Sequence, residues 1–532
     1  MTEVEAAAPR DGQSVPVWAE ALGEMEFRRG LALGMGGEEK VARQHAHGRL
    51  TARERIDLLL DEGSFAEIGV FTGKGTYDED GRLVSVVPAN VVVGTGAVGG
   101  VRVVVVAEDF TVRGGSSEST SPEKWQYAER LALEYRMPIV RLVETAGGSV
   151  NLLEQAQATK IPGYPHWPWM DMLGVIPVVG VALGACAGLG AMRVVASHFS
   201  VMTKGTSQVF AGGPAVVAPG VGEKIGKQEL GGSDVHARGS GVVDNEAEDE
   251  ADALGQVRRF LSYLPASVFE MPRRVEPVDC PDRREESLAS VIPLEKRRAY
   301  SMRSVLEAVF DRGSLFEIGR FQGRSLIAML GRLDGYPVAV MGNDPMHSGG
   351  ALTAEAAEKM IRFVDMCDTF HLPIVNFVDQ PGTYVGSTAE ARGTVRVGVR
   401  AAIMLEQVSS PWCTIFVRRA FGLAGGAFGP QTHGLTQRYA WPSAYWGSIP
   451  IEGGVEAAYK SDIASAPDPD ARREELIRHF KPIESPFRTA ERFGIQDIID
   501  PRQTRPILCS WIESAYRLIP EHLGIKARTM RC

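Results

Sequence analysis

The chain has 532 residues, too many for one hydrophobic core, so we expect two to four domains. Its 44% hydrophobic and 23% charged content is ordinary for a globular protein, and a net charge of −9 leaves no general basic surface for nucleic acid. The six cysteines form no CxxC pair, which argues against a zinc knuckle, and their wide scatter argues against a disulfide framework, so a reducing cytoplasm fits best.

The N-terminal segment, residues 1–36, is acidic and interrupted by Pro and Gly, and it lacks the basic and apolar blocks of a secretory signal. We expect it to be flexible. The longest uncharged run, 172–192, is long enough to cross a bilayer but contains Pro177 and five glycines. We therefore predict a buried strand, a turn and a helix there, and no membrane partner.

Residues 37–62 have apolar positions at helical spacing, and Thr51 precedes Glu54 in a capping-box pattern, which predicts a helix that stops at Gly63. Runs rich in β-branched residues at 84–94 and 101–107 are typical of strands buried on both faces. A helical segment and another apolar strand follow, so the order is strand, helix, strand, as in a βαβ unit.

The second half of the chain repeats the first. Landmarks that recur at a constant spacing of 235 residues are the Gly pairs ending at 115 and 350, the Glu-Lys pairs at 123 and 358, the strands that begin at Pro138 and Pro373, Gly147 and Gly382, and the turns that begin at Ala185 and Ala420. Residues 61–69 also match residues 311–319. Several matches in one order indicate two α/β domains of the same fold, residues 37–270 and 301–532, joined by an exposed linker over 271–300 that is rich in Pro, Asp, Arg and Glu.

Each half carries two glycine-rich turns after apolar strands, at 144–148 and 184–191 and again at 379–383 and 422–427. Backbone N–H groups at such turns can hold an oxyanion without any titratable side chain, although a tight turn inside a core would use the same residues. No Ser-His-Asp order, GxSxG elbow, HExxH motif or P-loop is present, so nucleophilic and metal-dependent hydrolysis lose support.

Few side chains qualify as catalytic candidates. Glu144 and Asp379 close corresponding strands, and they either form a general acid/base pair or cap a turn or helix N-terminus. His347, beside a Gly pair, is either catalytic or structural. Arg418 and Arg419 either approach an anionic substrate or occupy solvated or ion-paired positions.

An ordered series of stretches, from about residue 40 to 525, resembles the carboxyltransferase (beta) subunit of biotin-dependent acyl-CoA carboxylases, the propionyl-CoA and methylcrotonyl-CoA carboxylase group. The matching stretches are GRLTARERIDLLLDEGSFAEIG, DFTVRGGS, FAGGPAVV, ELGGSDVHARGSGVVD, MRSVLEAVFDRGSLFEI, NDPMHSGGAL, FVDQPGT and RRAFGLAGG.

The resemblance implies two tandem crotonase-like β/α superhelix domains in a hexamer, a trimer of dimers, with each active site between the N-terminal domain of one subunit and the C-terminal domain of its neighbour. Carboxybiotin on a carrier domain releases CO₂, the biotin ureido nitrogen takes a proton from the acyl-CoA α-carbon, and the resulting enolate attacks CO₂. This chain has no Met-Lys-Met biotinylation site and no ATP-binding carboxylase region. The resemblance therefore implies an alpha-subunit partner that supplies the biotin carboxylase and the biotin, a coenzyme A thioester as substrate, and no metal in this chain.

Two oxyanion holes made of backbone amides are also implied. The family's N-domain Gly-Gly pair falls on Ala146-Gly147, followed by Gly148, which we assign to biotin, and its C-domain Gly-Ala pair falls on Leu423-Ala424. Since neither first position is glycine, a positive φ is disfavoured there, so either the local conformation differs or the hole shifts. The further substrate-binding candidates are Gly114, Gly115, Gly382, Thr383, Gly425 and Gly426.

The sequence leaves open which acyl-CoA is the substrate and whether the reaction runs as carboxylation or decarboxylation. Propionyl-type members carry Tyr-Asp where this chain has Gly425-Gly426, and together with the Trp-rich insertion at 164–169 this favours a larger or unusual acyl group, unless packing elsewhere fills the space. Two alternatives to carboxylation remain. One is an acyl-CoA decarboxylase of the same fold, coupled to a membrane pump or independent of biotin, and the other is a non-catalytic subunit in a mixed ring.

Overall fold

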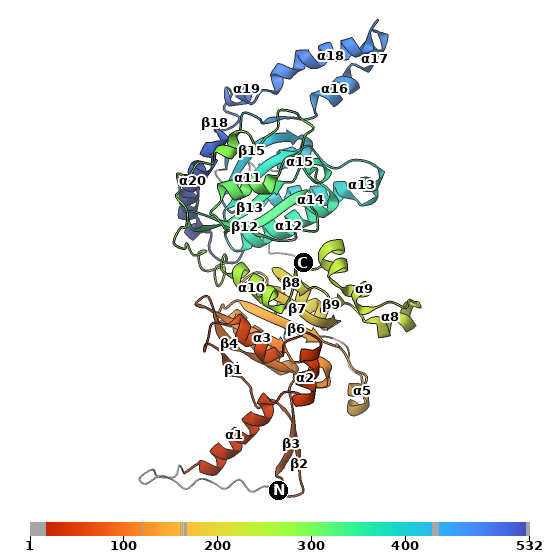
Figure 1. Ribbon diagram of the computed structural model, residues 1–532, viewed down its shortest axis with the longest axis vertical. Coiled ribbons are helices and arrows are strands. Elements are labelled where there is room, and N and C mark those ends of the chain that lie inside the picture. The colour runs from red at the N-terminus through yellow and green to blue at the C-terminus, as the bar shows by residue number, and fades with distance from the viewer. Residues whose placement is uncertain are drawn as a thin grey trace.

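The computed structural model of the chain describes residues 17–119, 121–159, 161, 163, 167–427 and 436–527. The molecule is elongated, with the N-terminal half (N half) at the bottom of Figure 1 and the C-terminal half (C half) above it. Each half is built on one eight-stranded sheet, and a separate two-stranded ribbon, β2 (Gly73–Tyr77) and β3 (Leu83–Pro88), projects from the lower end.

The N-half sheet runs in the order β1-β4-β5-β6-β7-β8-β10, with β9 paired to β7. Its first two pairings are antiparallel and the rest are parallel. Residues 91–94 of β4 and 103–107 of β5 are buried, as their composition predicts, whereas residues 84–88 lie in the partly exposed strand β3. The strands are β1 (Ala66–Ile68), β4 (Val91–Val98), β5 (Val101–Glu108), β6 (Ile139–Thr145), β7 (Val178–Ala187), β8 (Phe199–Thr203), β9 (Gln208–Phe210) and β10 (Asn245–Ala247).

The C-half sheet has the same order, β11-β12-β13-β14-β15-β16-β18, with β17 paired to β15. The strands are β11 (Phe316–Glu317), β12 (Leu326–Leu333), β13 (Tyr336–Asn343), β14 (Ile374–Gln380), β15 (Trp412–Phe421), β16 (Gln437–Ala440), β17 (Tyr445–Gly447) and β18 (Asp497–Ile498). The predicted internal repeat is therefore confirmed at the level of topology, and the fold is a tandem α/β arrangement of two crotonase-like domains.

One detail of the repeat was predicted wrongly. Thr145 of β6 pairs with Cys186 of β7, whereas Gln380 of β14 pairs with Ala420 of β15. The spacing between the halves is thus 235 residues at β6 and β14 but 234 at β7 and β15, because one residue is missing from the connection before β15. Gly188 therefore corresponds to Gly422.

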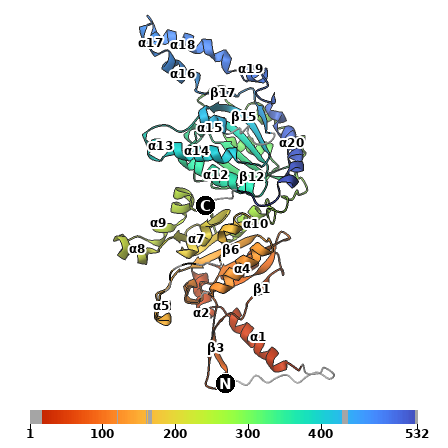
Figure 2. The ribbon, with the colours of Figure 1, turned by 180° about the vertical axis from the view of Figure 1, so that it is seen from behind.

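Helices cover both faces of each sheet (Figures 1 and 2). In the N half, α3 (Ala52–Leu59) and α10 (Glu250–Leu261) share a core with Val103 and Val105 of β5, while α4 (Pro122–Glu134) packs on the alternate residues Val104 and Val106. In the C half, α12 (Ala354–Thr369) and α14 (Thr394–Glu406) pack on one face and α11 (Met302–Val309) and α20 (Thr504–Leu518) on the other.

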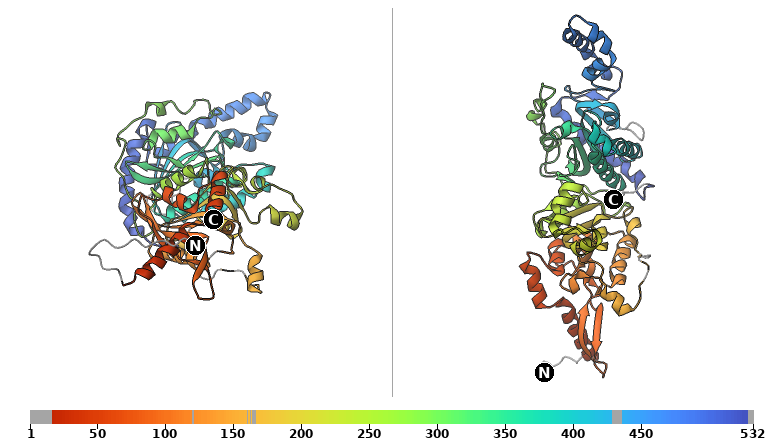
Figure 3. Two further views of the ribbon diagram at one scale, coloured as in Figure 1. Left: turned by 60° about the horizontal axis from the view of Figure 1, so that its bottom comes forward. Right: turned by 90° about the vertical axis from the view of Figure 1, so that its right-hand side faces the viewer.

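The remaining helices are short or project from the body. They are α1 (Ala19–Leu33), α2 (Glu38–Ala46), α5 (Asn151–Ala156), α6 (Trp169–Met172), α7 (Leu189–Val195), α8 (Pro214–Val221), α9 (Lys227–Gly231), α13 (Ser387–Ala391), α15 (Gly422–Ala427), α16 (Ile451–Ala458), α17 (Lys460–Ser465), α18 (Pro469–Phe480) and α19 (Pro486–Ala490). Helices α16 to α18 form an arm at one end of the molecule, and α1 lies at the opposite end (Figure 3).

Three boundaries differ from the expectation. The predicted helix over 37–62 is two helices, α2 and α3, although the capping box on Thr51 is present as predicted. Within the N-terminal segment expected to be flexible, residues Ala19–Leu33 form helix α1, while residues 1–16 lie outside the described residues. The strand expected over 84–94 is divided between β3 and β4, and Val84 of β3 is exposed. The segment 271–300 is mostly exposed, as predicted for a linker, and it is anchored to the C half, because Leu288 and Tyr300 are buried and Arg283 donates to the carbonyls of Ala308 and Phe310.

The two halves also share one hydrophobic core. Phe199 of β8 and Phe260 of α10 stack on each other, and Phe316 of β11 packs edge-on against Phe199. Across the described part of the chain, no helix combines the length and the apolar character needed to span a membrane.

Candidate functional site

The glycine-rich turns of the two halves have a positive φ at corresponding glycines. Gly147 after β6 has φ 85° and Gly382 after β14 has φ 122°, while Gly188 before α7 has φ 58° and Gly422 at the start of α15 has φ 62°. Only glycine adopts such angles without strain. Ala146 and Leu423, the two departures from the family's glycines, do not have positive φ. The conformation that needs glycine is therefore carried by their neighbours.

The Gly pairs 114–115 and 349–350 serve a packing role. All four glycines have positive φ, between 61° and 85°. A Cβ on Gly115 would lie 2.5 Å from the carbonyl oxygen of Glu144, and one on Gly350 would lie 2.7 Å from that of Asp379. These loops must therefore approach the ends of β6 and β14 closely, and only glycine leaves room for this.

Several of the candidate amides are already hydrogen-bonded. The N–H of Ala146 donates to the carbonyl of Gly114 at 3.0 Å, and the N–H of Gly147 donates to Thr145 Oγ1 at 3.0 Å. In the C half, the N–H of Gly382 donates to Gln380 Oε1 at 3.0 Å, and the bridge between Thr383 and Leu352 uses the carbonyl of Gly382 and the N–H of Tyr384, not the N–H of Thr383. The Ala146-Gly147 pair thus holds its own loop in this structure, so Gly148 is the amide of that turn on which the oxyanion hypothesis has to rest.

The second C-half turn opens helix α15. Leu423 is 68% exposed and Ala424 is buried, and both lie in the first turn, where backbone N–H groups have no acceptor within the helix. Gly425 is packed, because a Cβ there would lie 2.5 Å from the carbonyl carbon of Ala420, whereas no atom of the described residues lies within 4 Å of a Cβ placed on Gly426. Residues 428–435, which follow this turn, lie outside the described residues.

Glu144 is fully buried and held by cations from elsewhere in the N half. Its carboxylate forms an ion pair with Arg49, a second with Arg55 at 2.7 Å, and accepts a hydrogen bond from Gln44 at 2.7 Å. Arg55 also pairs with Glu250 at 2.7 Å. Gly184 of β7 leaves the space for this carboxylate, since a Cβ there would lie 2.4 Å from it.

Asp379 occupies the corresponding place in the C half and is also fully buried. It pairs with Arg418 at 2.9 Å and Arg419 at 2.6 Å, and it accepts a hydrogen bond from the Tyr300 hydroxyl at 3.1 Å. Arg419 donates in addition to the carbonyl of Gly349 at 2.8 Å, so it ties the Gly-pair loop to the strand end. Burial and the nearby Asp379 charge raise the pKa of Tyr300 well above its usual value.

These contacts argue against both roles considered for the carboxylates, general acid–base catalysis and helix capping. Neither Glu144 nor Asp379 is exposed, and each is held by two guanidinium groups, so neither is placed as a general acid or base. They do not cap helices either, since each anchors the strand end beneath a glycine-rich turn. Arg418 and Arg419 are ion-paired rather than presented to a substrate.

Two polar hollows lie beside the Gly-pair loops at corresponding positions. The N-half hollow, about 780 Å³, is lined by Arg113, Glu118 and Glu154, and the C-half hollow, about 610 Å³, by their counterparts Ser348, Thr353 and Ala389. The neighbouring helices α5 and α13 project from the same side of the molecule (Figures 1 and 2). Each half therefore has a hollow beside its Gly-pair loop, and the candidate amides of Gly148, Leu423 and Ala424 are not among the lining residues of either hollow.

His347 lines the C-half hollow but is not a free base. Its Nε2 lies 3.0 Å from Nη2 of Arg324, and since a guanidinium only donates, the imidazole nitrogen accepts. Partial burial and the Arg324 charge lower the pKa of His347 below its usual value. The Trp-rich insertion points elsewhere, because Trp167 is buried and its indole donates to Glu129, while residues 164–166 lie outside the described residues.

Some partners could not be found by sequence reasoning. Arg49, Arg55 and Tyr300 hold the two carboxylates from 79 to 95 residues away in the chain, and no local pattern marks them. Within the described residues, no group of three or more His, Cys, Asp or Glu side chains is arranged to hold a metal ion.

Comparison with known proteins adds independent information. The carboxyl transferase domain family matches residues 43–519. The chain is 35% identical to the propionyl-CoA carboxylase carboxyltransferase subunit of Haloferax mediterranei, over 91% of this chain and 94% of that one, and 34% identical to the methylmalonyl-CoA decarboxylase subunit alpha of Veillonella parvula, over 88% and 91%. Among solved structures, the hexameric transcarboxylase 12S with methylmalonyl-coenzyme A bound superimposes with a TM-score of 0.88 at 29% identity, covering 98% of this chain and all of that one.

Proposed function

Because the chain belongs to the carboxyl transferase family and is a biotin-dependent acyl-CoA carboxyltransferase, we propose that main-chain amides at its duplicated turns stabilise the oxyanions of the reaction. The observation that carries this is the positive φ that recurs at corresponding glycines of the two halves, Gly188 with Gly422 and Gly147 with Gly382, together with a ligand-sized hollow beside the Gly-pair loop of each half. Two similar sites suit a reaction with two partners that each develop negative oxygen.

The donors in the C half are the N–H groups of Leu423 and Ala424, at the start of α15. In the N half they are Gly148 and Leu189, which follows Gly188 as Leu423 follows Gly422. Removal of the α-proton of the acyl-CoA leaves an enolate whose oxygen these amides would hold, and the fixed amides need no reorganisation when the charge appears. The buried ion pairs of Glu144 and Asp379 keep the strand ends rigid beneath the turns.

Biotin, carried by a partner chain, supplies the activated carboxyl group and the base for the α-proton. The absence of a placed acid or base among the described side chains at the turns supports this division of labour. We propose an alpha subunit with biotin carboxylase and carrier domains as the partner, a hexameric ring of this chain, and a cytoplasmic location. The hexamer of transcarboxylase 12S supports the ring.

The acyl group is proposed to be larger than propionyl. The space that the described residues leave at Gly426, where propionyl-type members carry a side chain, supports this, whereas Gly425 is packed and contributes no room. The Trp-rich insertion no longer counts as support, because Trp167 is part of the N-half core.

The test removes one amide. Leu423→Pro deletes the N–H in the first turn of α15, where proline is tolerated, and Leu423→Ala is the matched control that keeps it. We expect carboxylation of acyl-CoA by the complex with the alpha subunit to fall about 100- to 1,000-fold in kcat for Leu423→Pro and to stay within about threefold for Leu423→Ala. Equal activity of the two variants would show that this amide stabilises nothing.

A second function, decarboxylation, is favoured by the similarity to the methylmalonyl-CoA decarboxylase subunit of Veillonella parvula. The same amides would stabilise the same enolate in that direction. Release of CO₂ from a malonyl-type CoA thioester by the isolated chain without biotin would support it, and release that requires the biotin-bearing partner would support the carboxyltransferase.

A further inference from the structure

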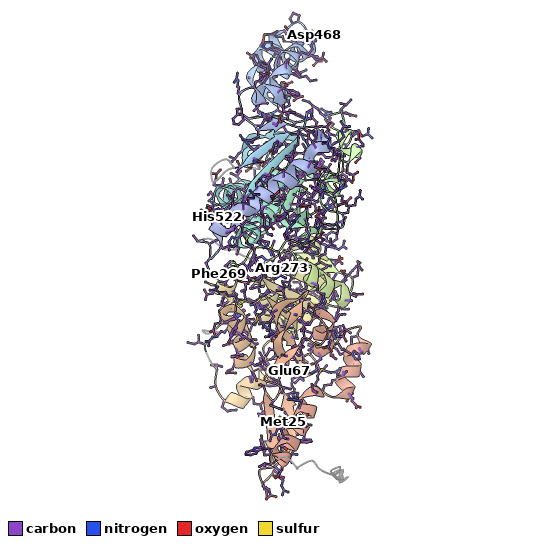
Figure 4. The ribbon with its side chains drawn as sticks, turned by 90° about the vertical axis from the view of Figure 1, so that its left-hand side faces the viewer. Met25, Glu67, Phe269, Arg273, Asp468 and His522 are labelled. Carbon is purple, nitrogen blue, oxygen red and sulfur yellow. The ribbon has the colours of Figure 1, made fainter. Side chains whose placement is uncertain are left out.

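A cavity of about 410 Å³ lies where the two halves meet, and it shares no lining residue with the hollows beside the glycine-rich turns. Its walls come from the β4–β5 turn, the end of α10 with the segment that follows it, and β12. Figure 4 shows Arg273, one of its lining residues, at the level of the junction between the halves.

The cavity is strongly basic although the chain is acidic. It is lined by four arginines, Arg102, Arg258, Arg273 and Arg332, and by a single carboxylate, Glu270. Arg258 is neutralised by Asp61 at 2.9 Å. For the other three arginines, no carboxylate of the described residues lies within 4.0 Å of the guanidinium group, and Arg102 donates to Thr95 Oγ1 at 2.9 Å. The lining therefore carries three arginines without an ion-pair partner among the described residues.

Arg332 is the most informative of these side chains, because only 9% of it is exposed. Its guanidinium donates to the carbonyls of Ser262 at 2.7 Å and Gly335 at 3.0 Å. Burial lowers its pKa, and the Asp311 charge acts on it only at longer range. The guanidinium also lies 5.0 Å from the centre of the Tyr263 ring. These partners carry no formal negative charge, and an anion in the adjoining cavity would compensate the buried cation more fully.

The fold itself does not require this arginine. By the repeat spacing, the residue of β4 that corresponds to Arg332 of β12 is Ala97, and the strand pairings agree, with Ala97 opposite Arg102 and Arg332 opposite Pro337. The N half therefore forms the corresponding strand with the alanine side chain of Ala97 at this position. Arg332 thus lines the cavity from the C half without an arginine at the corresponding N-half position, so the basic cavity is not part of the duplicated frame.

We propose that this cavity is a binding site for a phosphate-bearing small molecule of nucleotide size. Arginine forks match phosphate oxygens in charge and geometry, and the apolar lining of Val101, Leu264, Met271 and Val275 suits an uncharged ring or chain attached to the phosphates. The volume lies within the range of small-molecule sites. This site is separate from the proposed chemistry at the turns and does not depend on it.

Calorimetric titration of the full chain with ADP, pyrophosphate and coenzyme A at low salt tests the proposal. Arg273→Ala removes a cavity charge, and Arg274→Ala is the matched control, since Arg274 is the next residue but pairs with Asp334 instead of lining the cavity. We expect Arg273→Ala to weaken binding about tenfold and Arg274→Ala to leave it unchanged, with affinity falling as salt rises.

The ligands distinguish the two sources of phosphate. The comparison uses only the binding that Arg273→Ala weakens. If ADP binds more tightly than coenzyme A in that part of the titration, the site takes a free nucleotide. If coenzyme A binds more tightly, the site takes the phosphates of a coenzyme A molecule. Absence of any anion binding that depends on Arg273, or an equal loss in Arg274→Ala, would overturn the proposal. Circular dichroism of both variants confirms that they are folded, so a negative result stands.

Discussion

The substitution Asp379→Asn should separate a structural role for this carboxylate from a catalytic one. Asp379 is fully buried and forms two ion pairs, at 2.9 Å with Arg418 and 2.6 Å with Arg419. The neutral amide keeps the size but leaves the buried guanidinium of Arg418 and the partly buried one of Arg419 without their counter-ion. Breaking a buried pair from one side typically costs about 3–5 kcal/mol.

We therefore expect the free energy of unfolding of the C half to fall by about 3–5 kcal/mol. For a domain of this size that corresponds to a melting temperature lower by roughly 6–20 °C. Thermal and urea unfolding measure the change, and a double-mutant cycle with Arg419→Met isolates the pair, for which we expect a coupling energy above about 1 kcal/mol. Glu144→Gln should affect the N half in the same way, because Glu144 is held similarly by Arg49 and Arg55.

Activity gives the decisive comparison. If Asp379 only supports the turn, the kcat per folded molecule of Asp379→Asn at low temperature should stay within about tenfold of the unsubstituted chain, since general acid–base residues typically contribute about 100- to 10,000-fold. A fall of 100-fold or more with unchanged stability would refute the reasoning and restore Asp379 as a catalytic group.

Three further outcomes follow from the structure. Gly115→Ala, with φ 61° and a 2.5 Å clash, should lower the free energy of unfolding by more than about 1 kcal/mol, whereas Gly148→Ala, with nothing within 4 Å, should change it by less than about 0.5 kcal/mol. Burial lowers the pKa of His198 from 6.5 to about 4, so below pH 6.5 the unfolded chain binds a proton that the folded chain does not. The free energy of unfolding should therefore fall by up to about 3 kcal/mol between pH 6.5 and 4. His198→Leu should flatten this pH dependence, which urea titrations at several pH values measure. Trp167→Ala should destabilise the N half by about 3–5 kcal/mol without changing acyl-CoA preference in chain-length assays, because the indole lies in the core.

Much of the fold was predictable from the sequence because its signals are local and repeated. The valine runs of β4 and β5, the capping box at Thr51 and the constant spacing of Gly pairs each reflect a backbone requirement that one residue type meets. The division of the 37–62 helix, the helix α1 and the packing of 271–300 depend on contacts with distant segments, which a local pattern does not contain.

The site was predictable in place but not in detail. The turns at Gly147, Gly382 and Gly422 lie where the glycines indicated, yet Ala146 and Gly147 use their amides to close their own loop. Glu144 and Asp379 are ion-paired with arginines that lie far from them in the chain, so sequence alone could not exclude an acid/base role. Whether a carboxylate is buried and paired depends on tertiary packing, so it can be read from the structure but not from the local sequence.

The most direct test of the account is a crystal structure of the chain with an acyl-CoA bound. We predict that the thioester oxygen lies about 2.7–3.1 Å from main-chain nitrogens of a glycine-rich turn, either Leu423 and Ala424 or Gly148 and Leu189, with no carboxylate or imidazole in contact with the α-carbon. A thioester oxygen beyond hydrogen-bonding distance of every one of these amides, or an α-carbon facing the side chain of Glu144, Asp379 or His347, would contradict it.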